Sequence, residues 1–153
     1  MSLLSILKNG SNLTEHRLSS ADEMINFGRK MADVLLPNSI LALSGDLGAG
    51  KTTFVQGLGL GLKVADPIQS PTFVTLNLYQ GSLPLFHFDL YRLKGAADFL
   101  SLGFEEYFQN GGICAIEWPE RIASLIPQEA IHIHFSYSEK GRIAAVSNWD
   151  IPC

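Results

Sequence analysis

Cysteine, charge and long apolar runs are all scarce in this sequence of 153 residues. Its two cysteines, Cys114 and Cys153, cannot form a disulfide framework, so we expect free thiols in a reducing compartment. No window approaches the ~20 apolar residues that a membrane-spanning helix needs. The N-terminus lacks the basic patch, apolar run and small-residue cleavage site of a secretory signal. These absences predict a cytoplasmic protein without a membrane segment.

A clustered positive face is also missing. The chain has eleven Lys and Arg residues and fifteen Asp and Glu residues, which gives a net charge of −4. Arg29-Lys30 is the one adjacent basic pair. Non-specific nucleic-acid binding depends on clustered cations that neutralise phosphates. We therefore expect any role with a nucleic acid to act through a partner protein.

The apolar fraction of 46% is enough for one sizeable core, and the length is too short for two ordinary domains. We expect a single α/β domain over 1–153, with 1–13 its most loosely ordered part. The sheet is expected to be mixed and mostly parallel, flanked by helices, with a C-terminal antiparallel hairpin. Helices are predicted over 21–36, after position 50, over 96–108 with an interruption at Gly103, and over 119–125. Strands are predicted at 14–17, 39–43, 73–79, 83–91, 112–117, 130–137 and 142–149.

A phosphate-binding loop is the strongest motif, since residues 45–52 match G-x-x-x-x-G-K-[ST] without a departure. The glycines let successive N–H groups turn inward to cradle an anion, and the following helix adds its free N–H groups and dipole. The lysine would place its ammonium against the outer phosphates, and the first threonine hydroxyl would bind magnesium. The alternative is a glycine-rich turn that fits by chance. The nucleotide-binding residues predicted from this loop are Gly45, Asp46, Leu47, Gly48, Ala49, Gly50, Lys51, Thr52 and Thr53.

ATP is the favoured nucleotide, because the N-K-x-D element of guanine-specific proteins is missing. Three further glycines at 57, 59 and 61 could be mistaken for a dinucleotide fingerprint, but the third is misplaced and no strand precedes them. We interpret them as residues that loosen and end the helix after the loop, at about 1 kcal/mol for each interior glycine.

Two acids end strand-like runs and are candidates for a magnesium site. Glu117 closes the apolar run 113–116, and Asp89 follows 85–88. A phosphate loop requires a carboxylate at the end of a neighbouring strand. We assign Glu117 as the magnesium ligand and Asp89 as the residue that orders the attacking water or a water of the metal. The sequence alone does not exclude ordinary solvated acids, or decide which of the two orders the attacking water.

Thr72 is a third candidate catalytic residue beside Asp89 and Lys51. Pro71 stiffens its turn, and a threonine in such a loop can reach the γ-phosphate or its metal, although a capping hydroxyl is the plainer interpretation. In the alternating run that follows, His87 would share a face with Asp89 and Tyr91 if the strand continues, and a lone histidine there is more often structural. Trp118 and Pro119 after Glu117 would supply a rigid aromatic wall to the site, although packing is the plainer interpretation.

Four motifs together resemble a known family. They are Gly-Asp-Leu-Gly-Ala-Gly-Lys-Thr-Thr at 45–53, Ser-Pro-Thr-Phe at 70–73, His-Phe-Asp-Leu-Tyr-Arg at 87–92 and Ile-Glu-Trp-Pro-Glu at 116–120. Their order and spacing resemble TsaE, the bacterial ATPase of tRNA threonylcarbamoyladenosine biosynthesis. The likeness runs from about residue 21 to about residue 148.

The resemblance implies a compact P-loop fold that binds and slowly hydrolyses ATP with Mg²⁺. It also implies association with a TsaB–TsaD complex, which transfers a threonylcarbamoyl group to N6 of adenosine 37 in tRNA and which ATP hydrolysis resets. By this likeness Thr52 and Glu117 are magnesium ligands, Asp89 is needed for hydrolysis, and Gly141 and Arg142 lie near the nucleotide. The family often has threonine where this chain has Met24.

Two other functions share these motifs. A small-molecule kinase has the same loop, but it usually carries a lid with several arginines, whereas Arg92, Arg121 and Arg142 are well separated here. A nucleotide-sensing module without turnover would also need the loop. The fate of the γ-phosphate separates the first from an ATPase, and alanine at Asp89 or Glu117 separates the second.

Overall fold

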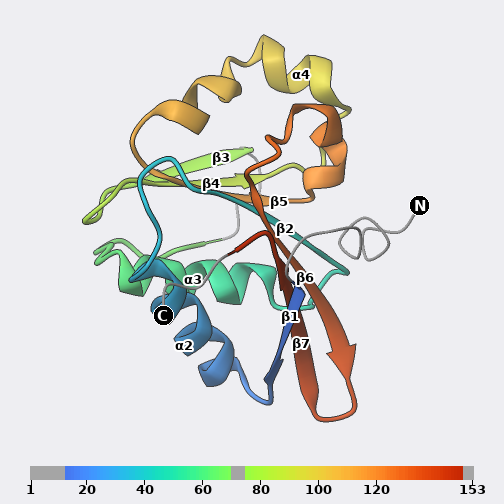
Figure 1. The fold of residues 1–153 in the computed structure, drawn as a ribbon. Coiled ribbons are helices and arrows are strands. Elements are labelled where there is room, and N and C mark those ends of the chain that lie inside the picture. The colour runs from blue at the N-terminus through green and yellow to red at the C-terminus, as the bar shows by residue number, and fades with distance from the viewer. Residues whose placement is uncertain (1–12, 70–74, 150–153) are drawn as a thin grey trace.

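The apolar run after Ser39 becomes β2 (Ile40–Gly45), the strand at the middle of the sheet (Figure 1). Our computed structural model describes residues 13–69 and 75–149. On its two sides β2 pairs in parallel with β5 (Ile113–Glu117) and β6 (Ile131–Ser138). Strands that are buried on both faces need apolar residues at nearly every position, which the sequences of β2 and β5 supply. The phosphate loop therefore leaves the sheet from its centre.

The outer strands make the sheet mixed, as predicted. β4 (Leu85–Asp89) runs parallel to β5, and β3 (Leu76–Tyr79) pairs antiparallel with β4 at one edge. On the other side β7 (Gly141–Ser147) forms the predicted hairpin with β6, and β1 (Leu13–Leu18) pairs antiparallel with β7. Within the described residues the strand order is β1-β7-β6-β2-β5-β4-β3. The predicted fold class is confirmed.

Helices α2 (Ala21–Ala32) and α3 (Lys51–Gly61) cover one face of the sheet. The Ser20 hydroxyl caps α2 by accepting the Glu23 N–H at 3.1 Å. The prediction that this helix reaches Leu36 is wrong. The Asp33 N–H bonds back to the Lys30 carbonyl in a tightened last turn. Beyond it Leu35 joins the core cluster from outside the helix, and Leu36 is 73% exposed.

The glycines of α3 have a different role from the one predicted. The helix continues through Gly57, and a side chain there would collide with the carbonyl oxygen of Ile25 in α2. A side chain at Gly28 would in turn collide with the Phe54 carbonyl of α3. These glycines let the two helix backbones approach closely, and α3 does end at Gly61.

The opposite face carries α4 (Ala96–Ser101) and two 3₁₀ helices, η1 (Phe104–Gln109) and η2 (Pro119–Leu125). Gly103, with φ of 72°, separates α4 from η1, which confirms the predicted interruption. Phe88 of β4 packs against rings from both helices at centroid distances of 5.6 to 6.4 Å.

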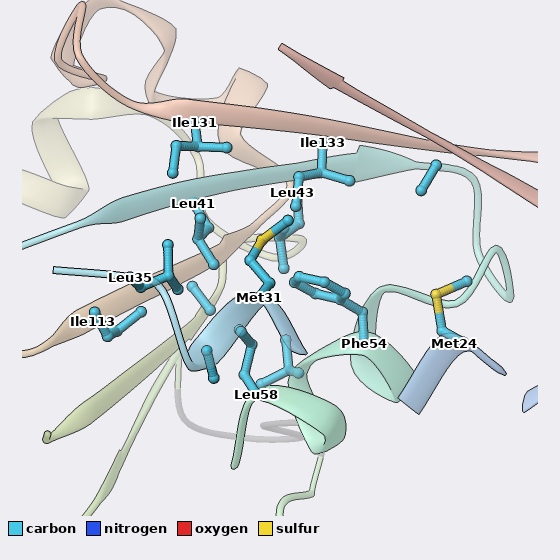
Figure 2. Close-up of a cluster of buried hydrophobic side chains, with 14 of the residues drawn as sticks. Met24, Met31, Leu35, Leu41, Leu43, Phe54, Leu58, Ile113, Ile131 and Ile133 are labelled. Carbon is cyan, nitrogen blue, oxygen red and sulfur yellow. The ribbon is translucent and has the colours of Figure 1, made fainter. Parts of the chain in front are cut away.

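The two faces of the sheet bury separate apolar clusters. Figure 2 shows the cluster beneath α2 and α3, where Met31 and Phe54 meet Leu41 and Leu43 of the central strand. The free thiol of Cys114 lies in the other cluster, where burial raises its pKa to about 12. Cys153 is outside the described residues, and no helix within them has the length and apolarity to cross a membrane.

Candidate functional site: a phosphate loop at the centre of the sheet

The loop between β2 and α3 has the backbone that anion binding requires. Gly45, Gly48 and Gly50 have φ angles of 140°, 77° and 112°, in the left-handed region that glycine tolerates. Space is limited as well, since a Cβ on Gly48 would lie 2.8 Å from the Tyr137 hydroxyl and one on Gly50 would lie 2.6 Å from Met24 Cε. These conformations and the start of α3 at Lys51 place free N–H groups and the positive end of a helix dipole together.

Lys51 is 5% exposed although it carries a charge. Its ammonium donates to the Gly45 carbonyl and lies 3.8 Å from the centre of the Trp118 ring. Burial lowers the pKa of Lys51, and the nearby carboxylates, Glu117 first, oppose that shift. The charge is therefore held in a poorly solvated place, where its interaction with an anion is strong.

Thr52 and Glu117 meet, as the magnesium assignment requires. The Thr52 hydroxyl lies 3.2 and 3.3 Å from the two Glu117 carboxylate oxygens, as a donor to both. Glu117 is 3% exposed at the end of β5, and the His87 Nε2 lies 2.5 Å from its Oε2. A buried carboxylate needs such partners, because desolvation of an unpaired one is costly.

Asp89 lies beside Glu117, since the two are register partners at the ends of β4 and β5. Burial is the main cause that raises the pKa of Asp89, with Glu117 acting in the same direction, while the hydrogen bond from the Tyr91 N–H at 3.1 Å lowers it. The expectation that Tyr91 continues this face is wrong. β4 ends at Asp89, and Tyr91 turns away to pack on Trp118, with ring centroids 5.0 Å apart.

Arg142 reaches the loop from the far end of the sequence. Its Nη2 donates to the Gly48 carbonyl at 3.3 Å, and its guanidinium lies 4.2 Å from the centre of the Tyr137 ring. The Tyr137 hydroxyl donates to the Leu47 carbonyl at 2.8 Å. Parallel β2 and β6 and the β6–β7 hairpin bring these groups together. Gly141 begins β7 beside the same corner.

Two cavities adjoin the loop. One of about 180 Å³ is lined by loop residues together with Asp89, Glu117 and Trp118. The other, of about 280 Å³, lies between the loop, the start of α2 and the start of β7, and its lining includes Ser19, Met24 and Arg142. A third and larger cleft of about 620 Å³ flanks the loop on the η2 side.

The described structure thus brings the predicted residues of the loop, Asp89, Glu117 and Arg142 into one region. Thr72 lies outside the described residues. Sequence reasoning missed the contact of Tyr137 with the loop and that of His87 with Glu117. Tyr137 carries no motif, and its contact with the loop spans 90 residues, so no local signal could have found it.

The donor set fits Mg²⁺ bound together with phosphates. Within 13–69 and 75–149 no three His, Cys, Asp or Glu residues converge as a self-sufficient metal site. Mg²⁺ in nucleotide sites does not need one, because it takes one or two protein oxygens, phosphate oxygens and waters. The Thr52 hydroxyl and the Glu117 carboxylate are such oxygens.

A glycine loop of this conformation, between a central parallel strand and a helix and beside acids at neighbouring strand ends, defines the P-loop class of α/β proteins. The family model described as "Threonylcarbamoyl adenosine biosynthesis protein TsaE" matches residues 18–144. The chain belongs to the TsaE family.

Individual relatives agree with this assignment. A protein of Nostoc sp. named "tRNA threonylcarbamoyladenosine biosynthesis protein TsaE" is 42% identical over 134 residues, which are 84% of this chain and 82% of that protein. One of the same name from Treponema pallidum is 43% identical over 114 residues, or 74% and 84% of the two chains. The crystal structure of Bacillus subtilis YdiB superposes with a TM-score of 0.76 and 32% identity, covering 92% of this chain and 88% of that one.

Proposed function

We propose that this protein binds ATP with Mg²⁺ and hydrolyses it slowly, as a subunit required for threonylcarbamoyladenosine formation in tRNA. The convergence of Lys51, Thr52, Asp89 and Glu117 on one cavity at the start of α3 carries the proposal. An ammonium, a hydroxyl and two carboxylates are the groups that phosphoryl-transfer sites use for phosphate, metal and water.

The phosphates would bind in the cradle formed by residues 45–53. Backbone N–H groups of the loop and of the first turn of α3 would donate to phosphate oxygens, and Lys51 would add its charge. Arg142 already lies on the loop through the Gly48 carbonyl, so its guanidinium is within the same region. The 280 Å³ cavity beside Met24 and Arg142 is the place we assign to the nucleoside.

Thr52 and Glu117 would hold the metal ion. The chemistry that Mg²⁺ would supply there is neutralisation of the phosphate charge. Asp89, one strand away from Glu117, would accept a hydrogen bond from the attacking water and orient it. Thr72, for which the sequence is the sole basis, would contact the γ-phosphate.

The biological role rests on the family. Relatives with 42–43% identity are named as tRNA threonylcarbamoyladenosine biosynthesis proteins. We propose that this chain acts on a TsaB–TsaD-type transferase complex and on tRNA through that complex. The net charge of −4 supports the indirect route, because tRNA attracts positive faces.

Phosphate release from ATP tests the activity. We expect Mg²⁺-dependent release of free phosphate, which Lys51→Ala, Asp89→Ala and Glu117→Ala abolish while the circular dichroism of the fold is unchanged. Lys63→Ala, at an exposed lysine beyond the end of α3, is the matched control and should hydrolyse as wild type. Transfer of phosphate to an added acceptor would instead identify a kinase. A wild type that releases no phosphate, with variants that differ from it only in nucleotide affinity, would identify a sensor.

A pull-down with and without ATP tests the partner. Recovery of a TsaB–TsaD-type complex in either condition, together with a faster ATPase rate when that complex is added, is the expected result. Equal rates with and without the complex would contradict the proposed coupling.

A further inference from the structure

We propose that His87 is a positioning residue that leaves one oxygen of Glu117, Oε1, available to a divalent cation and thereby favours Mg²⁺ over Ca²⁺. The inference rests on the magnesium-nucleotide function proposed above, which assigns no role to His87.

The contact between His87 and Glu117 is short and buried. His87 has no exposed surface, Glu117 is 3% exposed, and His87 Nε2 lies 2.5 Å from Glu117 Oε2. An ionised carboxylate can only accept, so the imidazole donates from Nε2. The pairing follows from the sheet, because His87 lies opposite Ala115 and two residues from Asp89, the register partner of Glu117.

Packing alone does not account for a histidine at this position. Its Nδ1 is buried and forms no hydrogen bond with the described residues. A buried polar atom without a partner is unfavourable, and an apolar residue, such as the flanking Phe86 and Phe88, would avoid that penalty. The bond to Glu117 is therefore the favourable polar interaction that the imidazole makes in this structure.

The bond also divides the carboxylate into two unlike oxygens. Oε2 receives the His87 proton, and the Thr52 hydroxyl spans both oxygens at 3.2 and 3.3 Å. Oε1, which the Thr52 hydroxyl also approaches but which receives no bond from His87, is consequently the oxygen with more free acceptor capacity. Ca²⁺ often takes a carboxylate through both oxygens, whereas the smaller Mg²⁺ demands octahedral geometry with few protein ligands. Fixing one oxygen on an imidazole works against two-oxygen binding.

Nuclear magnetic resonance of the metal-free wild type tests the hydrogen bond itself. The ¹⁵N shifts of the His87 ring should report a proton on Nε2, and Glu117→Gln should move the Nε2 signal. A ring protonated on Nδ1 alone would overturn the proposal.

Two amide variants test the metal preference. The side-chain nitrogen of glutamine can occupy the place of Nε2, whereas that of asparagine reaches only the place of Nδ1. Binding of a mant-labelled, non-hydrolysable ATP analogue is measured against Mg²⁺, against Ca²⁺ and in EDTA. We expect His87→Asn to raise the half-saturating Mg²⁺ concentration about tenfold, with a smaller rise for Ca²⁺, and His87→Gln to stay within about threefold of wild type. In EDTA the three proteins should bind the analogue alike.

His132→Asn is the matched control, because His132 is likewise a strand histidine whose buried Nδ1 has no partner among the described residues, and it lines neither of the two cavities assigned to the nucleotide. Its metal dependence should equal that of wild type. A His87→Asn protein that is folded and unchanged in Mg²⁺ requirement would overturn the role of His87 and leave the proposed function standing. Nucleotide binding by wild type that ignores Mg²⁺ would instead overturn the proposed function, and the ring tautomer would remain as an independent result.

Discussion

Asp89 illustrates how a single site residue opposes the stability of the fold. Its carboxyl is half-buried near another carboxylate, and its pKa is raised mainly by burial. A group with a higher pKa in the folded state binds more protons when folded, so the stability of the protein falls as pH rises through that window. At neutral pH, therefore, the Asp89 carboxylate weakens the fold that holds it.

Asp89→Asn should accordingly stabilise the metal-free protein at neutral pH, by less than about 1 kcal/mol because the carboxyl is partly solvated. Asparagine keeps an oxygen for the Tyr91 N–H. This stabilisation should shrink as pH is lowered toward 3.8, the ordinary pKa of aspartate, because the folded wild-type carboxyl is then protonated and uncharged like asparagine. Urea unfolding at several pH values measures it, and the exposed Asp66→Asn serves as control. A destabilised variant at neutral pH would contradict this account.

At the level of residues, the sequence predicts the groups that have a motif and misses those that act through register. The loop glycines, Lys51, Thr52 and Glu117 were found because phosphate binding fixes their spacing. The contacts of Tyr137 and His87 were missed, since they depend on which strands become neighbours. Local sequence does not encode that choice.

Among the elements, the close packing of α2 on α3 has the largest effect on the position of the loop. Each helix places a glycine against the backbone of the other, so the two axes come close together. Met24 of α2 then lies against the loop and lines the cavity beside it. The start of α3 then points its N–H groups into the site. Small residues at this contact thus serve the geometry of the loop as well as the core.

Gly57→Ala should destabilise the protein by about 2 kcal/mol or more, since the added methyl group meets the rigid Ile25 carbonyl. For a chain of this size, that corresponds to a fall in melting temperature of about 4–8 °C. Gly95→Ala is the control, because a Cβ there has no neighbour within 4 Å and the extended φ of 167° suits alanine. Similar melting temperatures for the two variants would contradict the packing argument.

Most helices and strands could be predicted from the sequence, but the residues at which they end could not. Apolar runs and the loop context predicted β2, β5 and the hairpins, because burial on both faces leaves a strong pattern. The early end of α2 was missed since Val34 and Leu35 continue the apolar spacing beyond Ala32, where the helix stops. The end of β4 at Asp89 was missed for the same reason, as Tyr91 keeps the alternation after the strand has stopped.

The whole molecule gathers its site from distant parts of the chain. Five segments border the two loop cavities or bind the loop: the start of α2, the loop after β2, the ends of β4 and β5, and the start of β7. A ligand bound there would contact nearly every layer of the fold. Nucleotide binding should therefore stabilise the protein as one unit.

At an ATP concentration about one hundred times its dissociation constant, linkage adds about 2.7 kcal/mol to the free energy of unfolding. We expect a rise in melting temperature of about 5–10 °C in ATP and Mg²⁺, measured by calorimetry. Lys51→Ala should lose the rise, whereas Lys63→Ala should keep it. An equal rise in Lys51→Ala would contradict the assignment of the phosphate site.

Trp118 holds its backbone at φ 60° and ψ 51°, a conformation that glycine and asparagine adopt more easily than a bulky residue. The indole lies over Lys51 and against Tyr91, so the strain is retained where its ring covers the ammonium. A directed-evolution screen that rewards heat resistance alone would relax this turn by selecting glycine or asparagine, and would discard the aromatic cover together with the strain.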